Sequence, residues 1–229
     1  MKAVCRLIAI IIFVCVNWVY AEERLPSQKE FEPPNGKGPV VVVISGQSGP
    51  GKIAYYAKDI ARQGYHTILV NGNDFWKKGE DGGALLKDVI TRAQESPHAV
   101  PGKAAVIGFS LGGASSLTYA TRMPALVSAV VTYYPATHFI RDPGAFVSKI
   151  KVPTLIFAGV LDTYKNCCLI ETARRLADAS KASKVTFRVI EYPNAAHGWA
   201  IKYSKEWRGD YAADAFRRTL DHLRENSGK

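Results

Sequence analysis

The stretch "AAVIGFSLGGAS" runs from Ala104 to Ser115 and changes character at its centre. An apolar run typical of a buried strand gives way to glycines, and small residues typical of a closely packed helix follow from Leu111. Between them stands Ser110, with a glycine two residues before it and another two residues after it. This G-x-S-x-G pattern, set between a strand and a helix, is typical of a nucleophile held on a sharp turn. A strand that ends in a flexible glycine loop would show the same pattern. The rest of the sequence is needed to distinguish these two interpretations.

The chain on both sides of this stretch alternates between two kinds of segment from Pro39 onward. Short β-branched runs typical of buried parallel strands are separated by segments with helical spacing of apolar residues. Such an alternation predicts a mostly parallel sheet with helices on both faces. Strands are expected at residues 39–45, 66–71, 103–109, 126–134, 152–159 and 184–192, and helices at 52–64, 83–96, 111–123, 167–180 and 204–225.

The position of Ser110 in this pattern suits a reactive group. Ligands of a parallel sheet gather at the carboxyl ends of its strands, and Ser110 directly follows the strand expected at 103–109. Side chains at Gly108 and Gly112 are expected to collide with the neighbouring strand and helix, so the turn requires glycine. The amino end of the next helix favours negative charge beside the serine. The segment between the strands at 126–134 and 152–159 is too short for a lid domain, so this site is expected to be open or covered only by loops.

A serine hydroxyl is a weak nucleophile without a base, and the base needs an acid to orient it. With this motif, the acid and then a histidine follow the serine along the chain, each beyond a later strand. Asp162 lies in the loop after the strand at 152–159 and is the candidate acid. It could instead cap the next helix, although Asn166 is better placed for that task. Asp142 and Asp178 are weaker candidates, because one precedes that strand and the other lies inside a predicted helix.

His197 is the candidate general base, because it alone of the five histidines follows Asp162 in a loop after the last strand. A loop histidine can swing over a serine and exchange a proton with it. The other four fit less well. His66 opens a strand, His98 and His138 come before the acid, and His222 lies inside the last helix.

A tetrahedral oxyanion also needs donors of hydrogen bonds. The backbone amide of Leu111, which follows the serine, is one candidate. The loop "SGQSGPG" (Ser45–Gly51) after the first strand should supply the second, and we predict the amide of Gln47. The same loop resembles a phosphate-binding loop, but Lys52 is followed by Ile53 rather than by the serine or threonine that such a loop requires.

Composition narrows the partners. The chain has 229 residues and a net charge of +10, with lysines and arginines scattered along it. The sequence has no basic stripe interleaved with aromatic residues and no zinc-ligand spacing, so neither nucleic acid nor a resident metal or cofactor is expected. The candidate serine nucleophile, rather than the composition, makes a small-molecule or lipid ester the expected substrate. The basic surface would keep the protein soluble, or attract it weakly to an anionic membrane surface.

The first residues are typical of a secretory signal, residues 1–21. Lys2 and Arg6 precede an apolar run from Leu7 to Val16, and Ala21 ends the segment with a small residue at the cleavage position. We therefore expect export to the bacterial periplasm or secretion. A membrane anchor is the alternative, but the apolar run is shorter than the roughly 20 residues that span a bilayer.

The remaining chain divides into two parts. Residues 22–38, rich in proline and charge, are expected to form an irregular lead-in or one edge strand, and residues 39–229 form a single domain. Two of the four cysteines would leave with the signal, and Cys167 and Cys168 remain as neighbours. A disulfide between adjacent residues closes almost no loop, so the fold is not disulfide-stapled. Packing, a reactive thiol and a strained disulfide all remain open for this pair.

Three segments now resemble one family. They are "VIGFSLGG" (Val106–Gly113), "VPTLIFAGVLD" (Val152–Asp162) and "YPNAAHGW" (Tyr192–Trp199). Together they are similar to the dienelactone hydrolase family of α/β-hydrolases over roughly Pro39 to Glu225. The resemblance implies the α/β-hydrolase fold without a lid domain, a serine hydrolase of an ester or lactone, and a catalytic triad made of the three candidates above.

The sequence departs from the family in two respects. The best-known members carry a cysteine nucleophile, whereas this chain has Ser110. Those members also hold the carboxylate of a lactone with arginines, for which we identify no counterparts here. An ester or acyl hydrolase is therefore the function that the resemblance implies, rather than a hydrolase of dienelactone itself.

A fainter likeness points elsewhere. The export signal, "VVISG" (Val42–Gly46) and "DFWKK" (Asp74–Lys78) resemble the periplasmic virulence protein VirJ family. That likeness implies an envelope lipid ester, such as aminoacylated phosphatidylglycerol, as the substrate. Two further alternatives are an acyltransferase that uses the same acyl-enzyme and a non-catalytic binding module on the same fold.

Overall fold

The valine-rich run that begins at Val40 forms a fully buried strand near the middle of a seven-stranded sheet. The computed structural model describes residues 28–227, so the predicted signal at 1–21 lies outside the described residues. Across the sheet the strand order is β1-β3-β2-β4-β5-β6-β7, and every neighbouring pair is parallel except β1 with β3. The strands are β1 (Gln28–Phe31), β2 (Val40–Ile44), β3 (His66–Val70), β4 (Ala104–Phe109), β5 (Val127–Tyr133), β6 (Thr154–Gly159) and β7 (Phe187–Tyr192).

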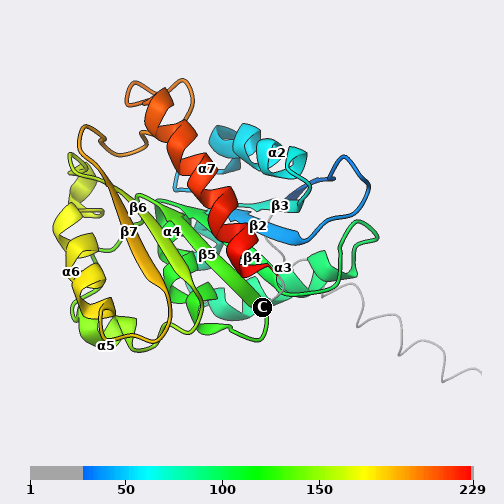
Figure 1. Cartoon of the computed structure of the whole chain (residues 1–229), viewed down its shortest axis with the longest axis horizontal. Helices are drawn as coiled ribbons and strands as arrows, with labels where there is room; N and C mark the ends of the chain where they lie inside the picture. The colour runs from blue at the N-terminus through cyan, green and yellow to red at the C-terminus, as the bar shows by residue number, and fades with distance from the viewer. Residues whose placement is uncertain (1–27, 228–229) are drawn as a thin grey trace, which may run out of the picture.

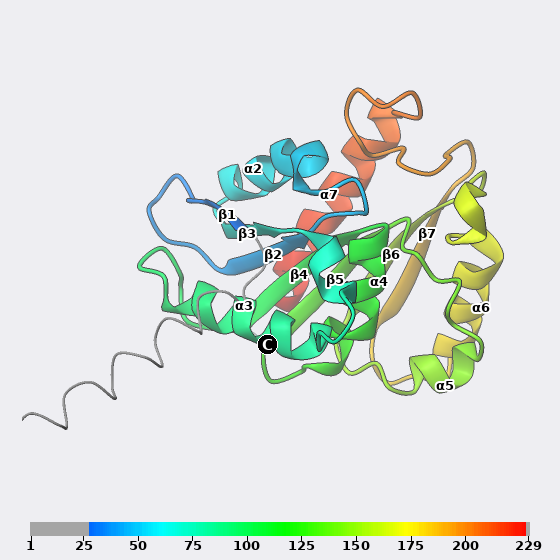
Figure 2. The ribbon, with the colours of Figure 1, turned by 180° about the vertical axis from the view of Figure 1, so that it is seen from behind.

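Helices cover both faces of the sheet, as the sequence predicts (Figures 1 and 2). Alternate residues of β2 point to opposite faces: Val41 and Val43 pack with α2 and α7, whereas Val42 and Ile44 pack with α3. Each such buried aliphatic side chain contributes about 2 kcal/mol of transfer free energy. The helices are α2 (Ala54–Arg62), α3 (Gly82–Glu95), α4 (Leu111–Thr118), α5 (Pro143–Val147), α6 (Ile170–Ser180) and α7 (Gly209–Asn226).

Helices α4, α5 and α6 share the face of α3, where Leu117, Val147 and Leu176 meet in one apolar cluster. Short 3-10 turns complete the described elements: η2 (Pro50–Ile53), η3 (Gly72–Trp76), η4 (Ala120–Arg122) and η5 (Tyr164–Asn166). Within residues 28–227, each helix is too short or too polar to cross a membrane.

The predicted strands and helices are found, with differences at their ends. In the described part of the lead-in, Gln28–Phe31 form edge strand β1, which is the edge-strand alternative. Helix α5 was not predicted. It begins at Pro143, capped by the carboxylate of Asp142, and its five residues are too few for a visible apolar period. In the described chain the segment between β5 and β6 holds only this short helix and no lid domain.

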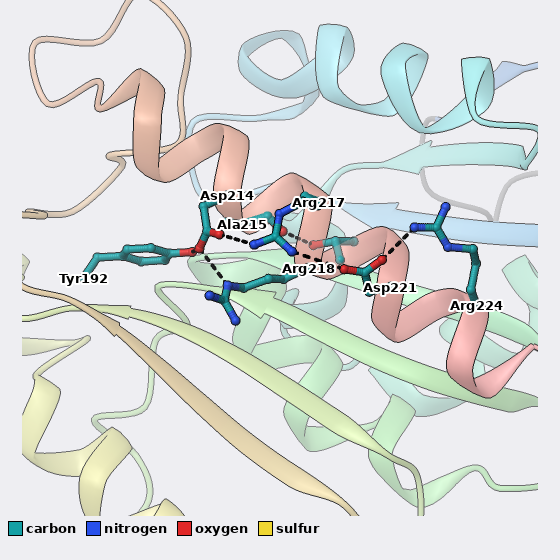
Figure 3. Close-up of polar contacts among 8 residues, drawn as sticks. Tyr192, Asp214, Ala215, Arg217, Arg218, Asp221 and Arg224 are labelled. Carbon is teal, nitrogen blue, oxygen red and sulfur yellow. Dashed lines mark hydrogen bonds and ion pairs between the residues drawn. The ribbon is translucent and has the colours of Figure 1, made fainter.

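A row of charged side chains runs along α7, and a hydrogen bond from Tyr192 to this row ties the helix to the sheet (Figure 3). The Asp214 carboxylate accepts hydrogen bonds from the Tyr192 hydroxyl at the end of β7 at 2.8 Å, from Arg218 at 2.7 Å and from Arg217 at 2.6 Å. Partial burial alone would raise the pKa of Asp214, but these three hydrogen bonds together outweigh it and lower the pKa. Asp221 continues the row with Arg217 and Arg224.

Candidate active site

Ser110 stands on the predicted turn between β4 and α4 with a backbone that side chains rarely adopt, φ +52° and ψ −111°. A Cβ at Gly108 would collide with the carbonyl oxygen of Gly112, and one at Gly112 would collide with that of Ile44. The collisions predicted at both glycines are therefore confirmed. The backbone of Ser110 is held by hydrogen bonds from its amide to Tyr133 and from Ala136 to its carbonyl, each 3.0 Å long.

The structure brings the three predicted side chains together. Ser110 Oγ lies 2.9 Å from His197 Nε2, and His197 Nδ1 lies 2.7 Å from Asp162 Oδ2. The carboxylate has no exposed side-chain surface, while the imidazole is 15% exposed. This geometry is that of a hydroxyl, a base and an orienting acid in a row.

Two loops that leave neighbouring strands position Asp162 and His197. The amide of Leu161 donates to the carbonyl of Ala195 at 3.0 Å, which joins the loop after β6 to the loop after β7. The second oxygen of Asp162 accepts from the amide of Tyr164 at 3.2 Å. Asn166 was the expected cap of the next helix, but it does not have that role. Helix α6 begins only at Ile170 and has Leu169 at its cap position.

Two tyrosines that sequence reasoning missed contact the His197 ring. The ring of Tyr164 stacks on it at 4.6 Å with an interplanar angle of 9°, and Tyr134 meets it edge-on at 5.0 Å. Burial raises the pKa of the Tyr134 hydroxyl well above its ordinary value, which keeps that group neutral. One signal was available: Tyr134 directly follows a strand, at the edge where Ser110 lies.

A cleft of about 340 Å³ opens beside Ser110 and His197. Gln47 lines it, and Leu111 follows the serine at the start of α4. Among residues 28–227, neither backbone amide donates a backbone hydrogen bond outside the helices and strands. The other lining residues are Gly46, Ser48, Gly49, Lys52, Ile53, Phe109, Tyr134, Tyr164, Lys165 and Ile201.

The weaker candidates lie elsewhere. Asp142 caps α5, and Asp178 pairs with Lys181 on the surface. His66 is buried on β3, and His222 on α7 is turned toward the carbonyl of Pro153. His98 contacts the carbonyl of Gly36, and the amide of His138 bonds to Cys167.

Cys167 and Cys168 form a disulfide, so of the three alternatives the structure adopts the bond between neighbours. Cys168 is buried against Ala114 and Ala136, and Cys167 is half-buried. In the described residues the two sulfur positions and a nitrogen of His197 lie within 4.8 Å of one another. The pair therefore lies beside the proposed base.

The family model of the dienelactone hydrolase family matches residues 72–227. A protein of Yersinia pestis whose name places it among the carboxymethylenebutenolidases is 27% identical over 235 residues, covering 87% of this chain and 86% of that protein. A similarly named protein of Escherichia coli O157:H7 is 26% identical over 129 residues, covering 54% of this chain and 46% of its own length. This chain also spans 64% of a similarly named relative from Methylorubrum extorquens.

Solved structures agree on the fold. A crystal structure from Klebsiella pneumoniae, named among the dienelactone hydrolases, superposes with a TM-score of 0.73 at 18% identity and covers 87% of this chain and 99% of its own. Esterase 2 of Thermogutta terrifontis, phosphonylated by cyclosarin, gives a TM-score of 0.70 at 17% identity and covers 87% of this chain and 89% of its own. The predicted α/β-hydrolase fold is confirmed, and the matches do not favour the fainter VirJ likeness.

Proposed function

Because this chain belongs to the dienelactone hydrolase family, we propose that it is a serine hydrolase that cleaves a carboxylic ester or lactone through an acyl-enzyme. The observation that carries the proposal is the unbroken row from Ser110 through His197 to Asp162, at 2.9 and 2.7 Å, at the edge of an open cleft. A protein that only binds a ligand has no need of all three groups in this order.

Each step of the proposed reaction uses a group in this row. His197 Nε2 takes the proton of the Ser110 hydroxyl as its oxygen attacks the ester carbonyl, and Asp162 stabilises the imidazolium that forms. The amides of Leu111 and Gln47 are proposed to bind the oxyanion. His197 then gives the proton to the leaving alcohol. Water, activated by the same histidine, releases the acid and restores Ser110.

The cleft supports an ester whose acyl or alcohol part carries a negative charge. Lys52, next to the proposed oxyanion loop, and Lys165, in the loop of the acid, both line it. No arginine is among its lining residues in the described chain, so these lysines are the proposed counterparts of the arginines that the family resemblance implies. A carboxylate between two ammonium groups gains electrostatic attraction without needing a buried ion pair.

This specificity predicts the effect of Lys52→Gln and Lys165→Gln. For an aryl hydrogen glutarate, whose acyl chain ends in a free carboxylate, each change should lower kcat/KM by about fivefold. For the uncharged aryl valerate, kcat/KM should stay within about twofold of wild type. Raising the ionic strength should reduce the preference of the wild type for the charged ester over the uncharged one. The variant that carries both changes should show no such effect of salt. Equal losses for both esters would contradict an electrostatic role.

Hydrolysis of short chromogenic esters by the wild type beside Ser110→Ala tests the proposal itself. We expect steady release of both the alcohol and the free acid by wild type, and none above background by the variant. Equal inactivity of the two proteins, with both correctly folded, would favour a binding module. Release of alcohol that needs an added acceptor alcohol would identify an acyltransferase instead.

Localisation and membrane contact remain predictions from the sequence. The proposed export rests on residues 1–21, which lie outside the described residues. The proposed weak attraction to an anionic membrane rests on the net charge of +10.

A further inference from the structure

Cys167 and Cys168 place two sulfur atoms beside His197, yet the proposed hydrolysis uses neither. One ligand atom from each of these three residues lies within 4.8 Å of the other two. The disulfide joins neighbours in the sequence, so loop closure gives it little stabilising effect. Stabilisation of the fold therefore does not explain why these three residues lie together.

A backbone contact of Cys167 and a side-chain contact of Cys168 hold the two cysteines in place independently of the disulfide. The carbonyl oxygen of Cys167 accepts hydrogen bonds from the amides of Thr137 at 2.7 Å and His138 at 3.0 Å. The side chain of Cys168 packs against Ala114 at the start of α4. Because none of these contacts depends on the sulfur–sulfur bond, its reduction would leave both thiols close to His197.

We propose that, when the disulfide is reduced, Cys167, Cys168 and His197 form a binding site for one zinc-class divalent cation. Two thiolates and an imidazole are the donors that such cations prefer, and a water molecule can complete a tetrahedral site. In the oxidised protein the sulfurs are joined to each other and cannot bind as thiolates. The disulfide therefore prevents the cation from binding.

The nitrogen available to the cation is His197 Nε2. Asp162 lies 2.7 Å from Nδ1 and fixes the proton there, so the lone pair is on the other nitrogen. A carboxylate behind a metal-bound histidine is a common arrangement in zinc sites. A cation on Nε2 would take the place of the Ser110 hydroxyl, which lies 2.9 Å away. Binding therefore removes the base, and this inhibitory consequence rests on the proposed function.

The chemistry balances with a dithiol as the reductant. The disulfide gains two electrons and two protons and becomes two thiols, while the dithiol becomes its own disulfide. On binding a divalent cation the two thiols lose their protons and the imidazole stays neutral. The two thiolates, the neutral imidazole and the divalent cation together carry no net charge. A small-molecule disulfide can reverse the reduction: it takes the two electrons of the thiolates, becomes two thiols, and the re-formed Cys167–Cys168 bond releases the cation.

Direct binding tests the site without any assay of hydrolysis. The protein is reduced with a water-soluble phosphine, desalted without air and titrated with Zn²⁺ against a chromophoric chelator. We expect about one Zn²⁺ per chain in the reduced protein and none in the oxidised protein at the same free concentration. Binding of Cd²⁺ as a second probe should add thiolate-to-metal charge-transfer absorption in the reduced protein only.

Two variants assign the ligands. Cys167 is half-buried, so Cys167→Ser is expected to fold, and it should lose the charge-transfer band of a two-thiolate site. His197→Ala keeps both thiols and should bind Zn²⁺ at least about tenfold more weakly. Equal binding by reduced and oxidised wild type would overturn the proposal, and so would unchanged affinity in His197→Ala.

The activity arm separates this proposal from the proposed hydrolysis. Zn²⁺ should abolish ester hydrolysis by the reduced wild type, a chelator should restore it, and the oxidised protein should be unaffected. If the reduced protein binds Zn²⁺ but no form hydrolyses esters, the proposed function fails and the metal site stands. Full activity of the Zn²⁺-loaded protein would instead overturn the assignment of His197 as a ligand.

Discussion

Ser110 carries a strained backbone, and its surroundings explain why the strain persists. A positive φ at a residue with a side chain costs about 1–3 kcal/mol, which the hydrogen bonds to Tyr133 and Ala136 help to offset. The turn aims the hydroxyl at His197, whose ring contacts the rings of Tyr164 and Tyr134. The strained turn and these ring contacts together keep the proposed nucleophile and base within reach of each other before any substrate arrives.

The proposed triad predicts unequal but large losses at its three positions. Ser110→Ala and His197→Ala should each lower kcat by about 10⁵- to 10⁶-fold on a short chromogenic ester, because the two act as a unit. Asp162→Asn should cost about 10⁴-fold, since the base remains but is no longer oriented. His98→Ala, on a surface loop, is the matched control and should keep full activity. A loss below about tenfold in His197→Ala would mean that another group is the base.

The order of the motifs along the chain was enough to predict that Ser110, Asp162 and His197 lie together. Each of them follows a strand that could be recognised from its apolar run. The stacking of Tyr164 on His197 could not be predicted. It depends on the path of a loop in which Lys165 and Asn166 adopt positive φ, and no local sequence signal marks that path.

At the scale of elements, the sheet was predictable and the caps were not. Buried parallel strands give continuous apolar runs, so β2 to β6 could be located within one or two residues. Short helix α5 has too few residues to show a period. The start of α6 was placed too early, because the apolar letters of Cys167 and Cys168 belong to the loop before it. Element ends depend on caps and tertiary contacts, which apolar periodicity does not record.

The contacts of α7 predict that Asp214→Asn destabilises the protein by about 1–2 kcal/mol at neutral pH. The carboxylate accepts from Tyr192, Arg217 and Arg218, and the variant would weaken all three bonds (Figure 3). Asp221→Asn is the matched control, because in the described residues Asp221 pairs with Arg217 and Arg224 of the same helix. Urea unfolding of both variants beside wild type measures the difference.

The lowered pKa of Asp214 determines how the stabilisation by its carboxylate changes with pH. Its stabilisation is fully present above the ordinary pKa of the group, 3.8, and is lost as the pH falls through the lower folded value. The gap between wild type and Asp214→Asn should therefore close only in acid. A gap that stays constant down to the acid transition would show that the carboxylate charge is not what ties α7 to the sheet.

For the whole molecule, buried histidines on opposite faces of the sheet make stability depend on pH. Burial lowers the pKa of His66 on β3 and of His222 on α7 from the ordinary value of 6.5. Glu30 and Glu32 face His66 and partly oppose this shift, while His98 adds to it. Around His222 the carbonyl of Pro153 and Glu225 oppose the shift and Arg188 adds to it.

The folded protein therefore binds fewer protons at these sites than the unfolded chain. Their contribution to the free energy of unfolding is present above pH 6.5 and falls as the pH drops through 6.5 toward the folded values. Urea unfolding midpoints should decrease from about pH 8 to about pH 5.5, a range in which Asp214 stays ionised. His222→Gln cannot titrate there and should show a smaller decrease than wild type. An equal decrease in the variant would contradict the account.

The central claim is that Ser110 is a nucleophile activated by His197, and a covalent phosphonate tests it most directly. The protein is incubated with an aryl phosphonate ester, and intact mass and peptide mapping locate the adduct. The account predicts one phosphonyl group per chain, on Ser110, absent from Ser110→Ala and formed at least about 10³-fold more slowly in His197→Ala. An adduct on another residue, or equal labelling of wild type and Ser110→Ala, would contradict it.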